Sequence, residues 1–394
     1  MDEQQLRELA VRRYEAGEEP KAIYTNLQRT KPWFFKWLKR FKNGDADWSK
    51  ELSRKPHSSP KKIDTTMEQT VIDARKQLES TPYARIGAVS IDWLLEQQGT
   101  ERPGLATINR VIERNDLTRK KPLRYNPKGV DYPLIEILRS NVVHQVDIVG
   151  PRYLKSGGRF YSINIIDAFD RRGNINPRLR QTKTDVAKAI IRSWETLGIP
   201  TYLQMDNTLA TQGSRLHPHS FGLVIRLCLL LGIQPVFIPI REPWRNGVVE
   251  RFNQDFEKLF FRAQFFKNFA HLCQQALNFE TYRERNHRYS TLNGHTPIQH
   301  ATDNLKLLSK NFEIPNKLAI KPGYIHLVRF IRSNRVLDIF SEKFLMPLDV
   351  VYEYVWATID TEQEKLFLYH DKKLFKELDY KLPSTAFDLS DLER

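Results

Sequence analysis

Cysteine and long apolar runs are scarce in this chain. Its 394 residues include only Cys228 and Cys273, too few for a disulfide framework or a cysteine-rich zinc site. Their apolar surroundings predict buried, reduced thiols. The most apolar run, Leu227 to Ile233, is far shorter than a bilayer span, which argues against a membrane protein. The opening Met-Asp-Glu-Gln-Gln lacks the basic and apolar regions of a signal peptide, so we expect a cytoplasmic protein.

Acidic residues are also in short supply. The chain has 62 Lys and Arg against 47 Asp and Glu, a net charge of +15, and its pI is near 9.6. A field of this sign attracts polyanions and predicts nucleic acid as the large partner, with a merely basic enzyme as the alternative. The hydrophobic content of 40% indicates a folded chain, and the length predicts two to four domains.

Apolar residues recur at helical spacing in two early segments. Residues 1–48 and 63–117 each predict three short helices, typical of a helix-turn-helix DNA-binding domain. Basic linkers at 49–62 and 118–135 are suited to contact with a DNA backbone. The candidate DNA contacts in these segments are Lys36, Lys39, Arg40, Arg54, Lys55, Lys61, Lys62, Thr107, Arg110, Arg114, Lys120, Lys121 and Arg124. For the helical positions the alternative is a solvated basic face.

Strands and helices alternate between residues 136 and 265, which predicts a layered α/β core. A helical extension is expected over 266–310. Short strands separated by polar turns predict a small β-barrel over 311–382, followed by a tail over 383–394. The whole is therefore expected to be a multidomain α/β protein, with tandem helix-turn-helix domains before the core and a small barrel after it.

Three carboxylates in the core are candidates for chemistry. Asp147 lies inside an apolar strand, Asp206 ends another strand, and Glu250 lies in the first turn of a helix, on its polar face. A buried aspartate needs a compensating charge, and Mg²⁺ or Mn²⁺ prefers oxygen ligands. Two such ions would support an in-line displacement at phosphorus. Taken singly, the three could instead pair with an arginine, cap a turn and cap a helix; taken together they predict a metal site.

The motifs around these carboxylates resemble a known family. The segment Pro243–Asn253 reads Pro-Trp-Arg-Asn-Gly-Val-Val-Glu-Arg-Phe-Asn, and His144-Gln-Val-Asp147 and Met205-Asp-Asn207 precede it. In these motifs, residues 142–265 resemble the catalytic core of the retroviral-integrase-like DDE recombinases, especially insertion-sequence transposases. The resemblance implies a ribonuclease H-like fold, the catalytic triad Asp147, Asp206 and Glu250, and two divalent ions, Mg²⁺ or Mn²⁺, held by that triad.

The chain departs from the family pattern in two places. Thr208 stands where the family usually has glycine, and the spacing from Asp206 to Glu250 is longer than usual. His217 and His219 in that long loop are expected to be solvated rather than metal ligands. Glu257, deeper in the same helix, is the rival to Glu250 as third ligand. Arg245 and Lys258 are the candidates to hold a DNA backbone near the metals.

The resemblance and the basic flanks together imply a DNA transposase. It would bind terminal inverted repeats, cleave the element ends by metal-dependent hydrolysis and join the 3′-hydroxyl ends to target DNA. Pairing two ends requires a dimer or tetramer on double-stranded DNA, in the bacterial cytoplasm and at the nucleoid when bound. The alternatives are a DNA-binding regulator with an inactive core and a metal-dependent nuclease without strand transfer.

Overall fold

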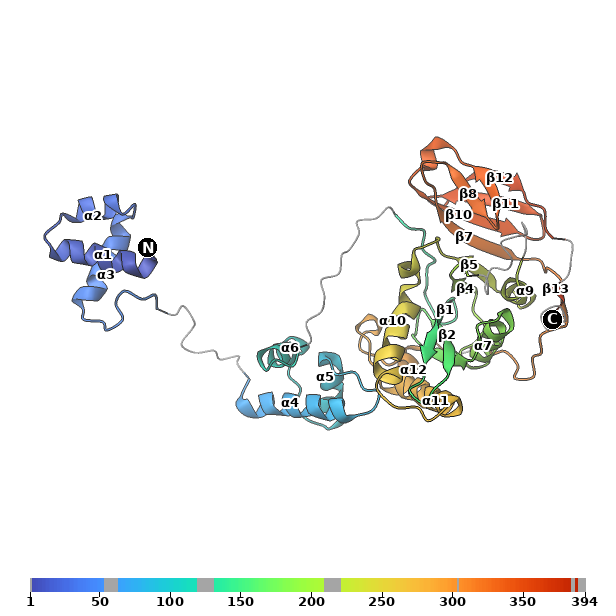
Figure 1. The fold of residues 1–394 in the computed structure, drawn as a ribbon, viewed down its shortest axis with the longest axis horizontal. Helices are drawn as coiled ribbons and strands as arrows, with labels where there is room; N and C mark the ends of the chain where they lie inside the picture. The colour runs from blue at the N-terminus through green and yellow to red at the C-terminus, as the bar shows by residue number, and fades with distance from the viewer. Residues whose placement is uncertain are drawn as a thin grey trace. The chain divides into compact units, whose positions relative to one another are not determined.

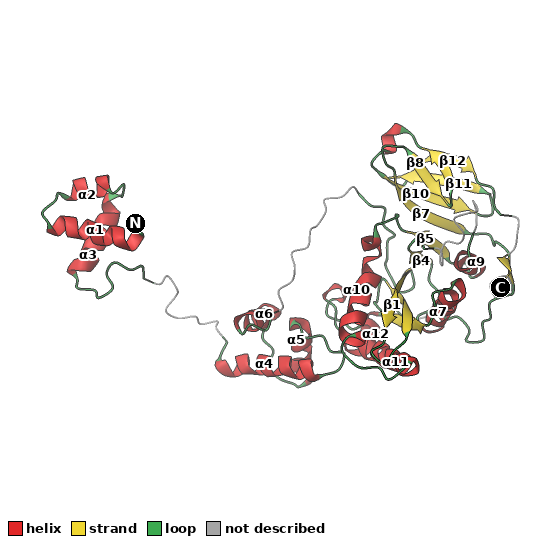
Figure 2. Cartoon of the chain, in the orientation of Figure 1, coloured by secondary structure: helices red, strands yellow, loops and turns green. Residues whose placement is uncertain are grey.

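The computed structural model describes residues 2–52, 63–118, 131–208, 221–302, 305–383 and 387–388. The chain forms two compact units, Met1–Ile63 and Asp64–Arg394. Figures 1 and 2 show their helices and strands. None of the helices in the described ranges has the length and apolar character needed to span a membrane. Cys228 and Cys273 are free thiols; the first is buried and the second is partly exposed.

The first unit is a bundle of three helices. They are α1 (Glu3–Glu15), α2 (Pro20–Asn26) and α3 (Lys31–Lys42). The Asp2 side chain accepts a hydrogen bond from the Gln5 amide at the start of α1, and Thr30 does the same for Trp33 at the start of α3. Ala10, Ile23, Phe34 and Leu38 form the buried core between the helices. The three helices expected in residues 1–48 are therefore present.

The second unit begins with three more helices, α4 (Thr65–Ser80), α5 (Ala88–Gln97) and α6 (Leu105–Arg114). Each turns an apolar stripe inward, and Val71, Ile91, Leu95 and Ile108 are fully buried. The loop after α4 lies against the core of the same unit, since Tyr83 Oη donates a hydrogen bond to Gln275 Oε1 at 2.9 Å. These helices match the second predicted group of three.

The core is a large mixed sheet. Strands β1 (Val143–Tyr153), β2 (Arg159–Asp167) and β3 (Gly173–Arg178) run antiparallel, and β4 (Tyr202–Met205) and β5 (Gln234–Phe237) continue parallel to β1. In the full sheet the order of nine strands is β12-β11-β10-β7-β5-β4-β1-β2-β3. The predicted α/β core is thus confirmed.

Helices cover both faces of the part of the sheet formed by β1 to β5 (Figure 2). Ile163 and Ile165 of β2 pack with α7 (Lys183–Thr196) and α9 (Leu223–Leu230), whereas Phe160 and Ile166 pack on the opposite side. That opposite side holds α10 (Gly247–Asp255), its π-helical continuation η2 (Phe256–Phe261) and α11 (Phe269–Asn286). Because side chains alternate along a strand, nearly every residue of β2 is buried on one face or the other.

The C-terminal strands extend the core sheet. β5 pairs in parallel with β7 (Tyr324–Phe330), through Val236 opposite His326 and Phe237 opposite Leu327. Beyond it lie β10 (Tyr354–Asp360), β11 (Lys365–His370) and β12 (Lys373–Asp379). The shorter strands β8 (Val336–Ile339) and β9 (Glu342–Leu345) pair with each other, as do β6 (Lys317–Leu318) and β13 (Phe387–Asp388).

This topology corrects the predicted small barrel over 311–382. The strands exist, but in the described part of the chain they continue an open sheet instead of closing on themselves. Strand and turn patterns predict where strands lie and not which edge they join. β4 pairs with only one edge of β5, and β7 provides hydrogen-bond partners for the backbone groups of the other edge. The helical extension is also shorter than expected at its end, because α12 covers only Pro297–His300.

Candidate functional site

The three predicted carboxylates come from two neighbouring strands and one helix. Asp147 lies in β1, and Asp206 directly follows β4, the parallel neighbour of β1. In that pairing Gln145 lies opposite Gln204, so continuing the register by two residues brings Asp206 beside Asp147. Glu250 lies in the first turn of α10. The sheet and helix thus bring together residues that are distant in sequence.

Side chains of β1 and β4 fix the start of α10. Gln145 Oε1 accepts hydrogen bonds from the backbone amides of Val248 and Val249, at 3.1 and 3.0 Å. Two amides that a helix leaves unpaired in its first turn are thereby satisfied. Asn246 Nδ2 donates to the Val146 carbonyl at 2.9 Å, and Gln204 Nε2 donates to the Arg245 carbonyl at 3.0 Å. These bonds set the position of Glu250 relative to Asp147.

The electrostatics of Asp147 indicate that the three carboxylates are close. Burial, followed by the negative charge of Asp206, raises the pKa of Asp147 from 3.8 to about 6, and Glu250 adds to the rise. Hydrogen bonds from the Ile148 amide and the Asn253 side chain act in the opposite direction. Asn253 Nδ2 donates to Asp147 Oδ2 at 2.6 Å. A buried acid that is repelled by two others is typical of a functional site.

A cavity of about 390 Å³ opens at these groups. Asp147 and Glu250 both line it, and so do Asn253 and the predicted DNA contact Lys258. Asp206 is outside the set of lining residues and acts on Asp147 through its charge. Basic side chains of Arg152 and Arg262 also line the cavity. It therefore combines carboxylates with cations able to approach a phosphate.

The rival third ligand, Glu257, has other partners. Its Oε1 accepts a hydrogen bond from Arg152 Nε, and its Oε2 accepts one from Arg262 Nε at 3.1 Å. Two guanidinium groups therefore compete for this carboxylate, whereas Glu250 influences the charge of Asp147 directly. This arrangement favours Glu250 over Glu257 as the third acid of the site.

Oxygen ligands in this arrangement fit a hard divalent cation. Burial and the charges of Asp206 and Glu250 leave Asp147 in need of positive charge, which Mg²⁺ or Mn²⁺ would supply. Among the described residues, however, there is no group of three or more His, Cys, Asp or Glu side chains placed to hold a metal ion. The predicted pair of ions is therefore kept as a proposal. His217 and His219, in the loop after Asp206, lie outside the described residues.

Arg245 is held away from this cavity. Its Nε donates to Glu242 Oε2 at 3.0 Å, its Nη2 donates to the Tyr354 hydroxyl at 2.9 Å, and its guanidinium lies 4.0 Å from the centre of the Tyr132 ring. These contacts place it beside the C-terminal strands. Its predicted contact with DNA near the metals stays a prediction that this geometry does not favour.

The other predicted DNA contacts lie on helix surfaces or outside the described residues. Lys36 and Lys39 are exposed on α3, whereas Arg40 donates to the Lys50 carbonyl at 2.8 Å. On α6, Thr107 is half-buried, Arg110 is exposed and Arg114 forms an ion pair of 2.6 Å with Glu68. The positions that fall outside the described residues are Arg54, Lys55, Lys61, Lys62, Lys120, Lys121 and Arg124.

Two site residues, Gln145 and Asn253, carry roles that the sequence did not reveal. Gln145 immediately precedes the strand residues that lead to Asp147, and Asn253 closes the Pro243–Asn253 motif. The sequence signal that could have identified them is their spacing, because Gln145 lies two residues before Asp147 and Asn253 lies three residues after Glu250. Position i+3 on a helix lies beside position i, so Asn253 shares a face with Glu250.

Comparison with known proteins identifies part of the core. Residues 231–297 match the family described as "Integrase core domain". The curated proteins yield no match to the chain. The HTLV-2 integrase catalytic core domain in complex with magnesium is similar in its dimeric form at 18% identity, over 41% of this chain and 97% of that chain, with a TM-score of 0.31. Its trimeric form is similar at 16% identity, over 42% and 99%, with a TM-score of 0.32.

A larger assembly is similar over more of the chain. The simian T-cell lymphotropic virus intasome, in complex with the PP2A regulatory subunit B56 gamma, matches at 14% identity over 76% of this chain and 95% of that chain, with a TM-score of 0.35. The family match covers Glu250 and the whole Pro243–Asn253 motif. Residues 231–297 are thus similar to the integrase core domain, in agreement with the resemblance of the motifs to the DDE integrases and transposases.

Proposed function

We propose that this protein is a DNA transposase of an insertion sequence, which cuts the ends of its element and joins them to target DNA. The observation that carries the proposal is the convergence of the acids. Asp147 and Glu250 line one cavity, and the charges of both Asp206 and Glu250 raise the pKa of Asp147. The match of residues 231–297 to the integrase core domain supports the same reaction class.

The acids would hold Mg²⁺ or Mn²⁺ through their carboxylate oxygens, the ligand type that suits these hard cations. A bound pair of such ions supplies an activated attacking oxygen and neutralises charge on the leaving oxygen. The protein's own contribution is positioning. Asn253 orients Asp147 by its 2.6 Å hydrogen bond, and Gln145 holds the start of the helix that carries Glu250. Lys258 and Arg262 line the cavity where a DNA phosphate would lie.

The two groups of three helices would bind the terminal inverted repeats. Exposed Lys36, Lys39 and Arg110 are placed on helices α3 and α6, the third of each group. Phosphate contacts would give affinity, and base contacts from the same helices would set the register on the repeat. A dimer or tetramer would bring two element ends together, in the bacterial cytoplasm.

The test uses the full chain and labelled DNA duplexes that carry the inverted repeats flanking its gene. With Mg²⁺ or Mn²⁺, the wild-type protein should nick the repeat end and join it to a second duplex. Asp147→Asn and Glu250→Gln should each lower both steps by at least about a thousandfold, because such groups act as one unit. Binding of the repeat should be unchanged. Glu257→Gln is the matched control on the same helix and should retain the larger part of the activity.

Other outcomes would overturn the proposal. Cleavage without joining would assign a metal-dependent nuclease. Repeat binding with neither step, under both metals, would assign a DNA-binding regulator with an inactive core. Full activity of Asp147→Asn would remove the carboxylate site from the mechanism altogether.

A further inference from the structure

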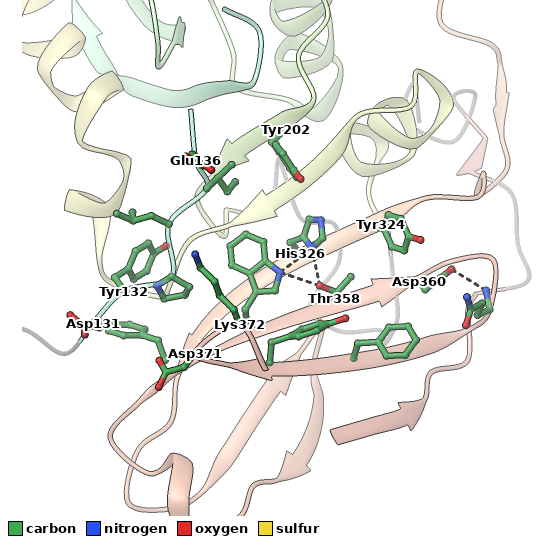
Figure 3. Close-up of a pocket in the computed structure, with 18 residues that line it drawn as sticks. Asp131, Tyr132, Glu136, Tyr202, Tyr324, His326, Thr358, Asp360, Asp371 and Lys372 are labelled. Carbon is green, nitrogen blue, oxygen red and sulfur yellow. Dashed lines mark hydrogen bonds between the residues drawn. The ribbon is translucent and has the colours of Figure 1, made fainter. Parts of the chain in front are cut away.

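A second and larger cavity lies at the C-terminal strands. Its volume is about 1020 Å³, and its walls are residues 131–136 on one side and one face of β7, β10 and β11 on the other (Figure 3). Its lining residues differ from those of the cavity at Asp147. This space, here called the aromatic cavity, is therefore separate from the carboxylate site.

The sheet face that forms its floor is rich in rings. In the strand register Trp356 lies opposite Tyr369, and Thr358 lies opposite both His326 and Phe367. Side chains two residues apart on a strand share a face, so these rings lie in adjacent rows. Tyr324, on the same face of β7, is 44% exposed. Figure 3 shows His326, Thr358 and Tyr324 on the strands below Tyr202, and Trp356, Phe367 and Tyr369 line the same cavity. The floor offers flat apolar surfaces to an occupant.

Hydrogen bonds hold the centre of this floor. His326 Nδ1 lies 2.9 Å from Thr358 Oγ1, and its Nε2 lies 2.8 Å from Gln234 Oε1. Trp356 Nε1 donates to Thr358 Oγ1 at 3.1 Å. Burial lowers the pKa of His326 to about 4, so the ring is neutral near pH 7. The floor is therefore ordered before binding and adds no positive charge.

The lining is acidic, although the chain is strongly basic. Its charged members are the four carboxylates of Asp131, Glu136, Asp360 and Asp371 and the ammonium group of Lys372. Asp360 accepts hydrogen bonds from the amides of Glu362 and Gln363, so its charge is engaged in a turn. Asp131, Glu136 and Asp371 are exposed, and Asp371 lies 3.9 Å from His370 Nε2. These three acids present a rim of negative charge.

We propose that the aromatic cavity binds an extended segment of a partner protein that carries lysine or arginine together with proline or leucine. Aromatic grooves bind proline-containing extended segments because the rings pack against the preformed left-handed chain. The exposed acids would pair with the cations of the segment. Bases of single-stranded DNA also stack on aromatic side chains, but their phosphates would meet the three carboxylates. This proposal is independent of the proposed transposase activity.

The test measures fluorescence anisotropy of labelled synthetic peptides with the full chain. A peptide of repeated Lys-Pro-Leu units should bind, and a matched peptide of Glu-Pro-Leu units should not. Asp131→Asn and Asp371→Asn should each weaken binding about three- to tenfold at low salt, with the effect reduced at high salt. Lys372→Gln should strengthen binding. Asp349→Asn, an exposed acid outside the cavity, is the matched control and should leave binding unchanged.

The contribution of the rings to binding is tested with Tyr324→Ala. This side chain is partly exposed, so its removal leaves the buried core intact. It should weaken binding of the Lys-Pro-Leu peptide while the unfolding midpoint stays the same. The proposal is overturned if that peptide fails to bind, or if both peptides bind equally. It is also overturned if Tyr324→Ala weakens binding of labelled oligothymidine and leaves the peptide unaffected, which would make the cavity a site for single-stranded DNA.

Discussion

Asn253 of α10 donates a hydrogen bond to Asp147 of β1, with 2.6 Å between Nδ2 and Oδ2. Asn253 Oδ1 in turn accepts from Asn164 Nδ2 at 2.8 Å, and Asn164 Oδ1 accepts from Ser162 Oγ at 2.6 Å. Ser162 and Asn164 are fully buried in β2. A row of polar side chains therefore crosses from the sheet to the helix and ends on the proposed catalytic carboxylate.

Removal of this link should impair the reaction. We expect Asn253→Ala to lower strand cleavage about ten- to a hundredfold, the usual effect of losing a group that orients a ligand. The pKa of Asp147 should rise further, because the lost hydrogen bond favours its charged form. The acid limb of the pH–rate profile should therefore move to higher pH. An unchanged profile would contradict a positioning role, and the exposed Asn278→Ala on α11 serves as control.

Asp147 should also reduce the stability of the fold. Its pKa is raised to about 6 in the folded chain from an ordinary 3.8, so the folded chain holds the proton more tightly. The contribution of this group to the free energy of unfolding is fully present below about pH 4 and is lost as the pH rises through about 6. Without divalent metal, Asp147→Asn should raise the free energy of unfolding at pH 7 by about 1–3 kcal/mol and change little at pH 4.

Urea unfolding at the two pH values, with a chelator present, measures this difference. Glu257→Gln is the matched control, because its carboxylate accepts from Arg152 and Arg262 and should stabilise the fold. Destabilisation by Asp147→Asn at pH 7 would show that the carboxylate is compensated in the folded chain.

Two buried histidines predict a loss of stability in acid. His287 Nε2 donates to the Tyr83 carbonyl at 2.8 Å, and its Nδ1 is buried with no hydrogen-bond partner among the described residues. Burial, helped by Arg85, lowers the pKa of His287 to about 3, and burial lowers that of His326 to about 4. Both values lie below the ordinary 6.5. The unfolded chain therefore binds these protons first, and stability falls as the pH drops below 6.5.

Denaturant unfolding between pH 7 and pH 4 should show a decline of about 1–3 kcal/mol for each histidine. His287→Gln should remove part of this slope, whatever its effect at pH 7. The exposed Asn278 supplies the control, since Asn278→Ala removes no titratable group and should keep the slope of the wild type. An equal slope in the His287 variant would assign the acid sensitivity to other groups.

Local pattern was sufficient to predict the layers of the core. Alternation along β2 and the helical spacing of Val249, Phe252 and Phe256 both depend on near neighbours in sequence, and all three side chains are buried. The positions of Asp147 and Glu250 followed from the same pattern. Both side chains line one cavity, and their catalytic role stays a prediction.

Contacts between distant segments could not be predicted in this way. The pairing of β5 with β7 depends on which sheet edge is free, and no local spacing encodes it. The binding of Gln145 to the amides of α10 and the pairing of Glu257 with Arg152 likewise arise only when β1 and α10 meet. The hydrogen bond of Arg245 to Tyr354 also joins distant segments, and the contact of Arg245 with DNA stays a prediction.

Arg85, in the loop after α4, links the second group of three helices to α10. Its guanidinium pairs with Asp255 of α10, which is 4% exposed, and lies 4.1 Å from the centre of the Tyr289 ring. Arg85→Ala should lower the free energy of unfolding by about 3–5 kcal/mol, because it leaves a buried carboxylate without its main partner. Arg85→Ala combined with Asp255→Asn should recover part of that loss, a coupling that urea unfolding of both single variants and the double variant measures. If the losses in the free energy of unfolding are strictly additive, the ion pair itself contributes nothing to stability. The control is Arg102→Ala, whose partners Asp92 and Glu96 are more exposed, and it should lower the free energy of unfolding by less than about 1 kcal/mol.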